Sequence, residues 1–534
     1  MPGVDCTKKM NDMFIYLSSV HGEKHVYFDK GYYEFSLKDS VALDVKITET
    51  ERVIYDIDNK SRTFGFVMNK IDNLVLHGNK TRFLYKSAMS YLAIINSTNV
   101  VIDGIEFFSK TFNMHRLKVL RVEPGKFIDV RLSASSEYMC QNGDYYFIGD
   151  NFNMAFRDHA EDGSWYRKVE KNKSYSLQAS DHPLYGAKYI DNLRDHKFRV
   201  IGKLSKDIKV DDEYYIFPKY SKNLGIFIDK SKNIYFNNVG VRYSDSHAIL
   251  AQCCTDIFFN HMNFSPQNSM RLGAITDCIQ ISNCRGDVSV TNSIIKGTKD
   301  GINVHGIDFS VQQIYHNLNS VIVTFNNDKT FGFNPMMAGD IVEFIDNETM
   351  LPISKNIIVS SRLITDHTIE IFLKYDIKAT AQNNLRDVSA FPSCLTIRNN
   401  YFDDITKDAI KNNTPIAIID RNVFNDVDRN AISIVTDSIK HFNSVSIKKL
   451  EITNNVFARS SNYDILIENR ESKKRMNSYV HENIYLANNV FMKKSNRHVK
   501  IYNCKDIYLH ANILKHSCKV YAFKLYNCSV LKHK

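Results

Sequence analysis

The phrase Thr453-Asn454-Asn455-Val456-Phe457 decides the fold, because it returns repeatedly in the C-terminal part of the chain. Its copies are Arg398-Asn399-Asn400-Tyr401-Phe402, Asp420-Arg421-Asn422-Val423-Phe424, Ala487-Asn488-Asn489-Val490-Phe491 and, more loosely, His510-Ala511-Asn512-Ile513-Leu514. The Asn before the last pair falls at positions 400, 422, 455, 489 and 512, so the steps are 22, 33, 34 and 23 residues. A strand-and-turn unit that repeats at such steps is typical of a solenoid.

A right-handed parallel β-helix explains this repeat physically. Several phrases follow an alternating strand, such as Cys394-Leu395-Thr396-Ile397, in which every second side chain would point into the cylinder. Asn tolerates the left-handed backbone of a tight turn and can stack on the Asn of the next coil as a ladder. The same pattern occurs earlier, in Asn233-Ile234-Tyr235-Phe236-Asn237-Asn238 and in Asp287-Val288-Ser289-Val290-Thr291-Asn292. We therefore predict an all-β protein, a right-handed parallel β-helix, in which these asparagines are structural.

Two stretches without the phrase interrupt the repeat. Both are rich in aromatic and charged residues and predict small β-barrel-like insertions of antiparallel strands. The chain then divides into an N-terminal cap with the first coils, a first insertion, central coils, a second insertion and C-terminal coils, at 1–115, 116–220, 221–305, 306–392 and 393–534. At the N-terminus, Met10, Met13 and Phe14 recur at helical spacing. They predict a short capping helix, with Thr7 as its N-cap residue.

The composition excludes several classes of protein. The 534 residues are 43% hydrophobic and 24% charged, which is enough for a large core. No apolar run approaches the about 18 residues of a membrane span, so we expect no membrane partner. The net charge of +10 is spread along the chain, so we expect no nucleic-acid partner. None of the ten cysteines stands in a Cys-x-x-Cys pair, so we expect neither a metal site nor a cofactor.

The N-terminal segment leaves the compartment open. Met1 to Val20 includes Asp5, Lys8 and Asp12, where a secretory signal would have an apolar core. The chain is therefore cytoplasmic, or it is secreted or periplasmic after removal of a signal. Closed ends and charged outer strands would allow a monomer, whereas an exposed flank of the solenoid could pair two copies as a homodimer.

Two carboxylates in the central coils could carry chemistry. Asp277 lies in Ala274-Ile275-Thr276-Asp277-Cys278-Ile279, and Asp300 in Gly297-Thr298-Lys299-Asp300-Gly301-Ile302. They are 23 residues apart, about one coil, so we expect them on neighbouring coils of one face, at exposed turns. A pair of carboxyl groups suits cleavage of a glycosidic bond, in which one protonates the leaving oxygen and the other activates water. The alternative is that both are turn residues of a β-helix that uses Asp at many turns.

Further candidates each have a structural alternative. His305 could bond a sugar hydroxyl or be a turn residue. Gln252 and Arg271 lie on segments that lead to the same face, where Arg271 could equally be an exposed cation. Trp165, the single tryptophan, could stack on a sugar or anchor the core of the first insertion.

The chain resembles glycoside hydrolase family 110, the exo-acting α-1,3-galactosidases, from about residue 26 to residue 455. The resemblance rests on short phrases in the same order: Tyr27-Phe28-Asp29-Lys30-Gly31-Tyr32-Tyr33-Glu34-Phe35, Ile249-Leu250-Ala251-Gln252-Cys253, Asp277 with Cys284-Arg285-Gly286, Asn303-Val304-His305-Gly306, and Gly332-Phe333 with Gly339-Asp340-Ile341-Val342-Glu343-Phe344. It implies a β-helix with barrel insertions, a glycan substrate with a terminal α-galactose, and an inverting reaction. It also implies that Asp277 is the general acid and Asp300 the base, that Glu343 is a weaker catalytic candidate, and that Asn303 binds substrate.

The chain departs from this family at the base. The family pattern has an acidic pair before the phrase that begins at Asn303, whereas this chain has Lys299-Asp300. Two other functions therefore stay open. A β-helix polysaccharide lyase would use Lys or Arg to remove a proton from a uronic acid, and Lys299 could be that base. A glycan-binding solenoid without activity would suit the reduced number of acids.

Overall fold

The computed structural model describes residues 3–48, 61–134, 136–149, 152–156, 164–170, 173–176, 183–184, 186–218, 223–267, 270–326, 330–436, 446–469, 479–494, 497–516 and 522–531. The chain forms two compact units. The β-helix unit comprises Met1–Leu84, Ser90–Phe108 and Leu224–Lys534, and the insertion unit comprises Tyr85–Met89 and Ser109–Asn223.

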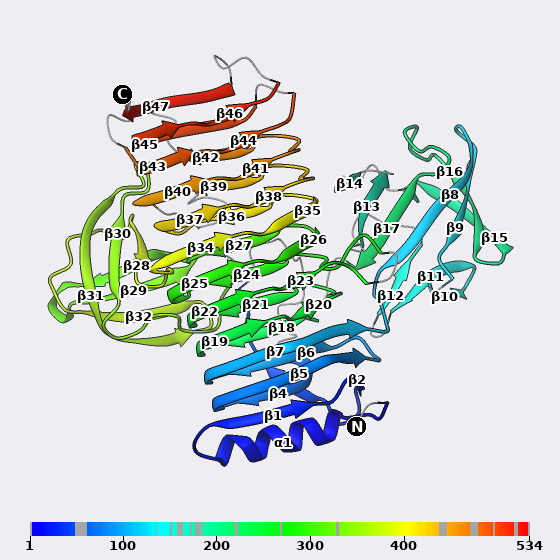
Figure 1. Cartoon of the computed structure of the whole chain (residues 1–534), viewed down its shortest axis with the longest axis horizontal. Helices are drawn as coiled ribbons and strands as arrows, with labels where there is room; N and C mark the ends of the chain where they lie inside the picture. The colour runs from blue at the N-terminus through cyan, green and yellow to red at the C-terminus, as the bar shows by residue number, and fades with distance from the viewer. Residues whose placement is uncertain are drawn as a thin grey trace. The chain divides into compact units, whose positions relative to one another are not determined.

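The β-helix unit is a right-handed parallel β-helix, as the sequence predicts. Its strands stack coil upon coil along three faces, from the N-terminal helix to the last strand (Figure 1). The strands Cys394–Arg398, Ile416–Asp420 and Lys449–Thr453 pair in parallel, with Ile397 opposite Ile419 and Ile419 opposite Ile452. This parallel pairing confirms the predicted stacking, since a meander would have paired them antiparallel.

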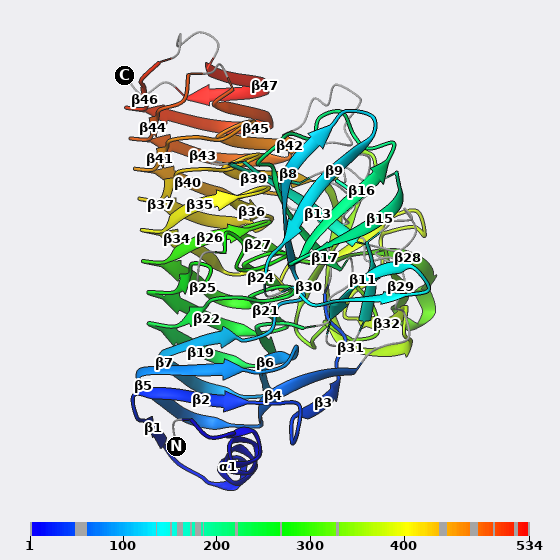
Figure 2. The ribbon, with the colours of Figure 1, turned by 90° about the vertical axis from the view of Figure 1, so that its right-hand side faces the viewer.

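The first face carries the longest strands, which lie one above another in Figure 2. They are β1 (Lys24–Phe28), β2 (Gly31–Phe35), β5 (Asp72–Tyr85), β7 (Thr98–Ser109), β19 (Lys232–Asn237), β22 (Thr255–Asn260), β25 (Arg285–Thr291), β34 (Cys394–Arg398), β37 (Ile416–Asp420), β40 (Lys449–Thr453), β43 (His481–Ala487), β45 (Val499–His510) and β47 (Phe523–Leu531).

The second face consists of short strands that follow the Asn corner. They are β20 (Gly240–Val241), β23 (Asn263–Phe264), β26 (Ile294–Thr298), β35 (Tyr401–Ile405), β38 (Val423–Phe424), β41 (Val456–Phe457), β44 (Val490–Phe491) and β46 (Ile513–Leu514).

The third face holds the strands that lead out of the predicted catalytic segments. They are β3 (Val41–Asp44), β4 (Ser61–Asn69), β6 (Ser90–Ile95), β18 (Ile226–Asp229), β21 (Ile249–Gln252), β24 (Ile279–Ser282), β27 (Ile302–His305), β36 (Ile410–Asn412), β39 (Ile432–Thr436) and β42 (Ile465–Asn469). All of these pair in parallel except β3, which is antiparallel to β4.

The repeated Asn phrase has two separate roles at the corner between the first and second faces. The second of its five residues takes the left-handed backbone, with φ of 56° at Asn399 and 57° at Asn454. The third residue forms the ladder: the backbone N–H and the Nδ2 of Asn422 both donate to Oδ1 of Asn455, at 2.8 and 3.1 Å. Asn455 donates to Asn489 in the same way. The predicted Asn ladder is therefore present, and Asn422, Asn455 and Asn489 in it are fully buried.

The N-terminal helix α1 (Thr7–Ser19) covers the first coil. Phe14 is buried and stacks on Phe66 of β4 at 5.4 Å between ring centroids. The helix is where the sequence predicts it, but its N-cap residue is Cys6, because Thr7 is already the first helical residue. Oδ1 of Asp5 accepts a hydrogen bond from the N–H of Thr7 at 3.0 Å. No helix among the described residues is long and apolar enough to cross a membrane.

The second insertion is a closed antiparallel barrel beside the β-helix (Figure 1). Its strands are β28 (Asp308–Tyr315), β29 (Ser320–Phe325), β30 (Ile341–Ile345), β31 (Pro352–Thr365), β32 (Thr368–Leu373) and β33 (Asn384–Asp387), with a 3-10 turn, η2, at His316–Leu318. Arg285 of β25 holds the barrel against the coils, because its guanidinium pairs with Asp340 and, at 3.2 Å, with Asp387.

The first insertion belongs to the insertion unit, and its described strands form two antiparallel sheets instead of a closed barrel. The larger sheet has the order β14-β13-β17-β8-β9-β16-β15 and the smaller one β10-β11-β12. The strands are β8 (His115–Glu123), β9 (Phe127–Leu132), β10 (Tyr138–Gln141), β11 (Asp144–Gly149), β12 (Phe152–Ala155), β13 (Ser164–Glu170), β14 (Lys173–Ser176), β15 (Ala187–Arg194), β16 (Lys197–Gly202) and β17 (Glu213–Pro218).

Candidate active site

A second repeated phrase places polar side chains at one corner of successive coils. The phrase consists of a polar residue, a small residue and Ile, in that order. The Ile is the first residue of strands β21, β24, β27, β36 and β39. The polar residues, which we name the corner column, are His247, Asp277, Asp300, Asp408 and Asn430. The backbone holds them in register, since Cys278 N–H donates to Asp300 C=O and Gly301 N–H to Asp408 C=O. Asp277 and Asp300 therefore lie on adjacent coils.

Both carboxylates are buried, which corrects the expectation of exposed turns. Asp277 and Asp300 are each 3% exposed. The small residues explain this burial: a Cβ on Gly301 would lie 2.4 Å from the carbonyl oxygen of Ala409, so the coils approach closely at this corner. A carboxylate held in such a place needs hydrogen bonds or charges to compensate for lost hydration.

Asp277 is held from both neighbouring coils. Its Oδ2 accepts a hydrogen bond from Nδ2 of Asn303 at 2.8 Å. The same oxygen lies 4.0 Å from Nε2 of His247, a ring that is 1% exposed and whose Nδ1 is 3.1 Å from Oγ of Ser246. The carboxyl group is thus fixed in orientation by its surroundings.

Asp300 is part of a side-chain ladder along the corner column. Its Oδ1 accepts from the backbone N–H of Asp408 at 2.8 Å. Oδ1 of Asp408 in turn accepts from the N–H and the Nδ2 of Asn430, at 3.0 and 2.8 Å. Asp300 therefore contributes to the stacking of the coils whatever its chemistry.

Three lysines set the charge state around Asp300. Burial of the Asp300 carboxyl favours its neutral form, but the positive charges of Lys411, Lys407 and Lys299 outweigh this effect and lower its pKa. Burial and the negative charge of Asp300 raise the pKa of Asp408. Asp300 is therefore the member of this buried pair that ionises first, as a general base must.

A segment of the N-terminal chain, Lys46 to Thr48, crosses this face and is named the strap. Gln252 binds it with both ends of its amide: Nε2 donates to Lys46 C=O at 2.9 Å, and Oε1 accepts from Thr48 N–H at 2.9 Å. Nε2 of Gln280 donates to Thr48 C=O at 2.8 Å. Nζ of Lys46 reaches Asp366 of the barrel at 3.6 Å. The strap thus covers the coils of Gln252 and Gln280.

Three side chains at one register position have unused hydrogen-bonding capacity. Gln280, Asn303 and Lys411 are opposite one another on β24, β27 and β36, and we name them the polar column. Oε1 of Gln280 and Oδ1 of Asn303 belong to fully buried residues, and neither atom has a hydrogen-bond partner among the described residues. A buried acceptor left unpaired costs about 1 to 3 kcal/mol, so these two oxygens are places where a further hydrogen-bond donor would stabilise the structure.

The other predicted site residues of the coils are placed as follows. Gln252 is engaged by the strap, as described above. His305 ends β27, is 2% exposed, and its Nδ1 lies 2.9 Å from Gly306 C=O. Arg271 is half-buried in the connection between β23 and β24.

The two candidates from the insertions do not belong to the corner column. Glu343 is in β30 of the barrel and forms an ion pair with Lys355 at 2.9 Å. Trp165 is in β13 of the insertion unit, and its side chain lies outside the part that the structure describes.

Sequence reasoning missed His247, Lys411 and the role of Gln280. The signal that could have found the first two is the corner phrase itself, because Ser246-His247-Ala248-Ile249 and Lys407-Asp408-Ala409-Ile410 repeat the pattern of Thr276-Asp277-Cys278-Ile279. Lys411 directly follows the second of these phrases. Gln280 has no such signal, since its partner Thr48 is 232 positions away in the sequence.

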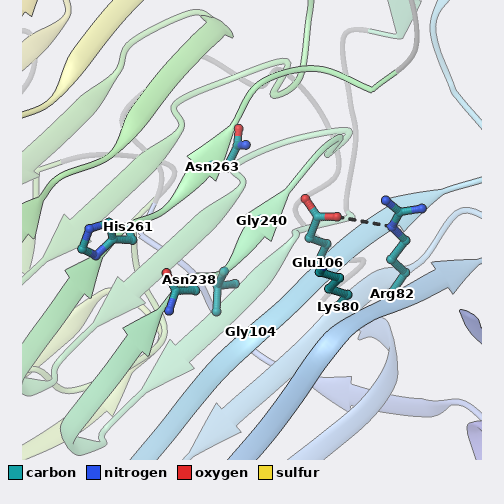
Figure 3. A pocket seen from close by; sticks show the side chains of 9 residues that line it. Lys80, Arg82, Gly104, Glu106, Asn238, Gly240, His261 and Asn263 are labelled. Atoms are coloured by element: carbon teal, nitrogen blue, oxygen red, sulfur yellow. Dashed lines mark hydrogen bonds and ion pairs between the residues drawn. The ribbon is translucent and has the colours of Figure 1, made fainter. Parts of the chain in front are cut away.

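A separate open cavity of about 380 Å³ lies elsewhere on the β-helix wall (Figure 3). It is lined by Lys80, Arg82, Gly104, Glu106, Asn238, Val239, Gly240, His261 and Asn263. Glu106 is already neutralised there by Arg82, at 3.4 Å, and by Arg242. The cavity contains no residue of the corner column. Among the described residues, no three His, Cys, Asp or Glu side chains are grouped to hold a metal ion.

The chain is similar in sequence to curated proteins named alpha-1,3-galactosidase A. The protein of Bacteroides thetaiotaomicron is 24% identical over 474 residues, which cover 84% of this chain and 78% of that protein. The protein of Akkermansia muciniphila is 23% identical over 75% of this chain and 67% of its own length. No family model matches the chain.

Solved structures show weaker likeness. A family 28 exopolygalacturonase of Yersinia enterocolitica matches 99% of this chain and 75% of its own, at 11% identity and a TM-score of 0.35. PfbA, a surface adhesin of Streptococcus pneumoniae, matches 99% of this chain and 89% of its own, at 11% identity and a TM-score of 0.33.

Proposed function

We propose that this chain is an exo-acting glycoside hydrolase that releases terminal α-1,3-linked galactose from glycans. The observation that carries the proposal is the pair Asp277 and Asp300 on adjacent coils, in a chain similar to α-1,3-galactosidases over 84% of its length. The similarity supports the class of glycoside hydrolase. The sugar, its linkage and the exo mode rest on the names and the family that the chain resembles.

The two carboxyl groups divide the reaction between them. Asp277, protonated, gives its proton to the glycosidic oxygen as the bond from that oxygen to the anomeric carbon breaks. Asp300, ionised, takes a proton from a water molecule whose oxygen bonds to the same carbon from the opposite side. The products are galactose with inverted configuration and a glycan with a free hydroxyl group. The lysines that lower the pKa of Asp300 support its role as base.

One observation favours a second function, glycan binding without hydrolysis. Asp300 belongs to the ladder with Asp408 and Asn430, so its presence has a structural reason, and Lys299 stands where the family pattern has an acid. A solenoid with these features would keep its shape and its ligand but lack turnover. A uronate lyase, with Lys299 as base, is a third outcome that the same experiment separates.

The test uses the purified chain and the variants Asp277→Asn and Asp300→Asn. Each is incubated with α-1,3-galactobiose and, separately, with polygalacturonate, with and without a chelator, and free galactose and unsaturated uronate are measured. We expect galactose release from the parent and at least a thousandfold loss in each variant. Asp103→Asn, on the first face, is the matched control and should retain activity.

Folding has to be measured beside activity, because both residues are buried. Asn at position 300 keeps an oxygen for the N–H of Asp408, and Asn at position 277 keeps one for Nδ2 of Asn303. We therefore expect melting temperatures close to that of the parent. Galactose release by both variants at the parent rate, or none by the parent, would refute the proposal; binding without release would support the second function.

A further inference from the structure

We infer that the open cavity on the β-helix wall is a second binding site, which takes one unit of a saccharide chain that carries an oxyanion, either a carboxylate or a sulfate ester. The inference rests on the proposed function only for the choice of a saccharide. It goes beyond that function, because the cavity contains no residue of the corner column and takes no part in hydrolysis.

The cavity lies at the corner where the chain passes from the first face to the second. Asn238 stands there between β19 and β20, and His261 stands between β22 and β23 on the next coil. Both residues take the left-handed backbone, with φ of 52°. The corner column instead precedes the strands of the third face. The cavity and the proposed catalytic residues therefore lie at different corners of the β-helix.

Glycines leave the space of the cavity open. Gly104 and Gly240 line it without side chains (Figure 3). Gly240 has no left-handed backbone that would require glycine, and a Cβ there would lie 3.2 Å from Cγ of Glu106. The volume of about 380 Å³ is at the lower end of the range for ligand sites, about 300 to 1,000 Å³. An open cavity of this size suits one sugar unit whose neighbours continue into solvent.

A shared carboxylate fixes two guanidinium groups beside the cavity. Glu106 pairs with Arg242 and, at 3.4 Å, with Arg82. Nη1 of Arg82 also donates to the hydroxyl group of Tyr32 at 2.7 Å, whereas its Nη2 has no hydrogen-bond partner among the described residues. Arg82 is therefore held in place with a donor left over, which reduces the side-chain entropy that a ligand would have to overcome.

Lys80 adds a positive charge to the lining. Its side chain is exposed, and within the described ranges no carboxylate lies within ion-pair distance of its Nζ. The lining thus has one ammonium group that only solvent or a ligand can neutralise.

Positive charge exceeds negative charge around the cavity. Asp103 is a second carboxylate in contact with the lining, and its Oδ1 already accepts from Nδ2 of Asn237 and Asn238, at 2.8 and 3.1 Å. The three cations described above outnumber the two carboxylates even when His261 is neutral. The local electrostatic potential therefore favours an anionic ligand.

Two amide groups supply hydrogen bonds for sugar hydroxyls. Oδ1 of Asn263 accepts from Ser265 N–H at 3.0 Å, and Nδ2 of Asn263 has no partner within the described part of the chain. Asn238 donates its Nδ2 to Asp103, and its Oδ1 is likewise without a partner there. A free donor and a free acceptor beside cationic groups suit a saccharide that has both hydroxyl groups and an oxyanion.

The chemistry fixes an oxyanion and leaves its source to the test. Lysine binds a carboxylate or a sulfate ester as a point charge, and the remaining Nη2 of Arg82 can donate to either. The ligand is accordingly a uronate-containing or a sulfated saccharide.

The experiment is affinity electrophoresis, in which the whole chain migrates through native gels that contain a polysaccharide. The probes are polygalacturonate, a sulfated galactan and a neutral galactan. We expect at least one anionic polymer to bind the parent about tenfold or more tighter than the neutral one. Comparison of the two anionic polymers identifies the source of the charge.

Charge reversals locate the binding. Lys80→Glu should weaken the binding of the preferred polymer about tenfold or more. Lys70→Glu is the matched control, because Lys70 is also exposed and left-handed, with φ of 57° against 53° at Lys80. Both changes lower the net charge of +10 equally, so non-specific attraction of a polyanion would weaken equally in both. We expect Lys70→Glu to stay within about twofold of the parent.

A second variant places a negative charge in the cavity itself. Asn263→Asp keeps the oxygen for Ser265 N–H and should also weaken binding about tenfold or more. Asn69→Asp, at the exposed end of β4, is its control and should bind as the parent does. Thermal unfolding of each variant is measured beside binding, and we expect melting temperatures close to that of the parent.

Three results would overturn the inference: equal binding of neutral and anionic polymers, equal weakening by Lys80→Glu and Lys70→Glu, or no binding of any polymer. The proposed hydrolysis is tested separately, since Lys80→Glu should release galactose from α-1,3-galactobiose at the parent rate. A chain that binds an anionic polymer through Lys80 and releases no galactose loses the hydrolase assignment and keeps this one.

Discussion

Nδ2 of Asn303 donates to Oδ2 of Asp277 over 2.8 Å, from one coil of the β-helix to the coil before it. The same amide presents its unpaired Oδ1 at the position next to Gln280 and Lys411. A single side chain therefore joins the candidate acid to the surface that would bind the sugar. A glycan that bonds Oδ1 would fix the amide plane and with it the orientation of the Asp277 carboxyl group.

Replacing Asn303 tests this link. Asn303→Ala removes the donor to Asp277, so we expect kcat for galactobiose to fall by about 10² while KM changes less than tenfold, since positioning of the acid matters most in the transition state. Steady-state kinetics measure both constants.

The matched control for that change is Ser433→Ala, at the same register position two coils beyond Asn303. It should leave both constants within threefold. An Asn303→Ala variant that folds and keeps the parent kcat would show that Asp277 needs no positioning by its neighbour.

Removing one charge of the buried pair should stabilise the fold. Asp408→Asn keeps an oxygen for the N–H and Nδ2 of Asn430 and ends the repulsion with Asp300. The raised pKa of Asp408 means that the folded state binds this proton more tightly than the unfolded state does. The destabilisation by ionised Asp408 is therefore absent below the pKa of this group in the unfolded chain. It appears as pH rises through its pKa in the folded chain.

We expect Asp408→Asn to gain about 1 kcal/mol against guanidinium unfolding at pH 7 and to lose that gain at pH 4. Asp420→Asn, whose carboxyl has a lowered pKa through bonds from Asn454 and Thr453 despite its burial, should instead lose stability at pH 7. Equal stability of Asp408→Asn and the parent at pH 7 would contradict the repulsion.

The Asn ladder should be costly to interrupt. Asn455→Ala removes the acceptor for the N–H and Nδ2 of Asn422 and the donor to Ile419 C=O at 2.8 Å. We expect a loss of about 2 to 4 kcal/mol in the free energy of unfolding, because these groups are buried. Denaturant unfolding followed by circular dichroism gives the value.

Asn454→Gly is the control for the ladder, since glycine keeps the left-handed φ of 57° at that position. Its loss should be below about 1 kcal/mol, because the only described side-chain bond removed is an Nδ2 donation to Asp420. Similar losses for the two variants would mean that the phrase works through its turn and not through its ladder.

The sequence predicted the β-helix because its determinants are local and repeated. Asn399 adopts the left-handed turn and Asn400 forms the ladder, and the repeated phrase indicates both roles. The spacing of Asp277 and Asp300 likewise predicted adjacent coils. Their burial could not be predicted, because it depends on how closely Gly301 and Ala409 bring the coils together, which no single phrase encodes. The strap could not be predicted either, because Thr48 and Gln280 are 232 positions apart in the sequence.

A buried histidine should give the stability a pH dependence. Burial, aided by Lys448, lowers the pKa of His481 from 6.5 to about 4, and Ile447 N–H donates to its Nδ1 at 3.3 Å. The unfolded chain therefore binds a proton at a pH where the folded chain does not. The contribution of neutral His481 to the free energy of unfolding is complete above pH 6.5 and falls as pH decreases from 6.5 to about 4.

His481→Asn keeps an acceptor for Ile447 and removes the titrating group. Between pH 7 and pH 4 we expect the free energy of unfolding to fall by about 1 to 3 kcal/mol less in the variant than in the parent. Guanidinium unfolding at several pH values measures this difference. His516→Asn, at an exposed position, should follow the parent curve, and a His481→Asn curve parallel to the parent would assign the acid sensitivity to other groups.

The barrel insertion does not interrupt the stacking of the coils on either side of it. Backbone N–H of Ser293 donates to Oδ1 of Asn400 at 2.9 Å, although 107 positions separate them and the whole barrel lies between. The two ends of the barrel meet, since a Cβ on Gly306 would lie 2.6 Å from the ring of Phe391. The coils on both sides of the barrel therefore pair as sequence neighbours would, and a different folded module whose ends lie equally close could take the place of the barrel without changing the stacking of these coils.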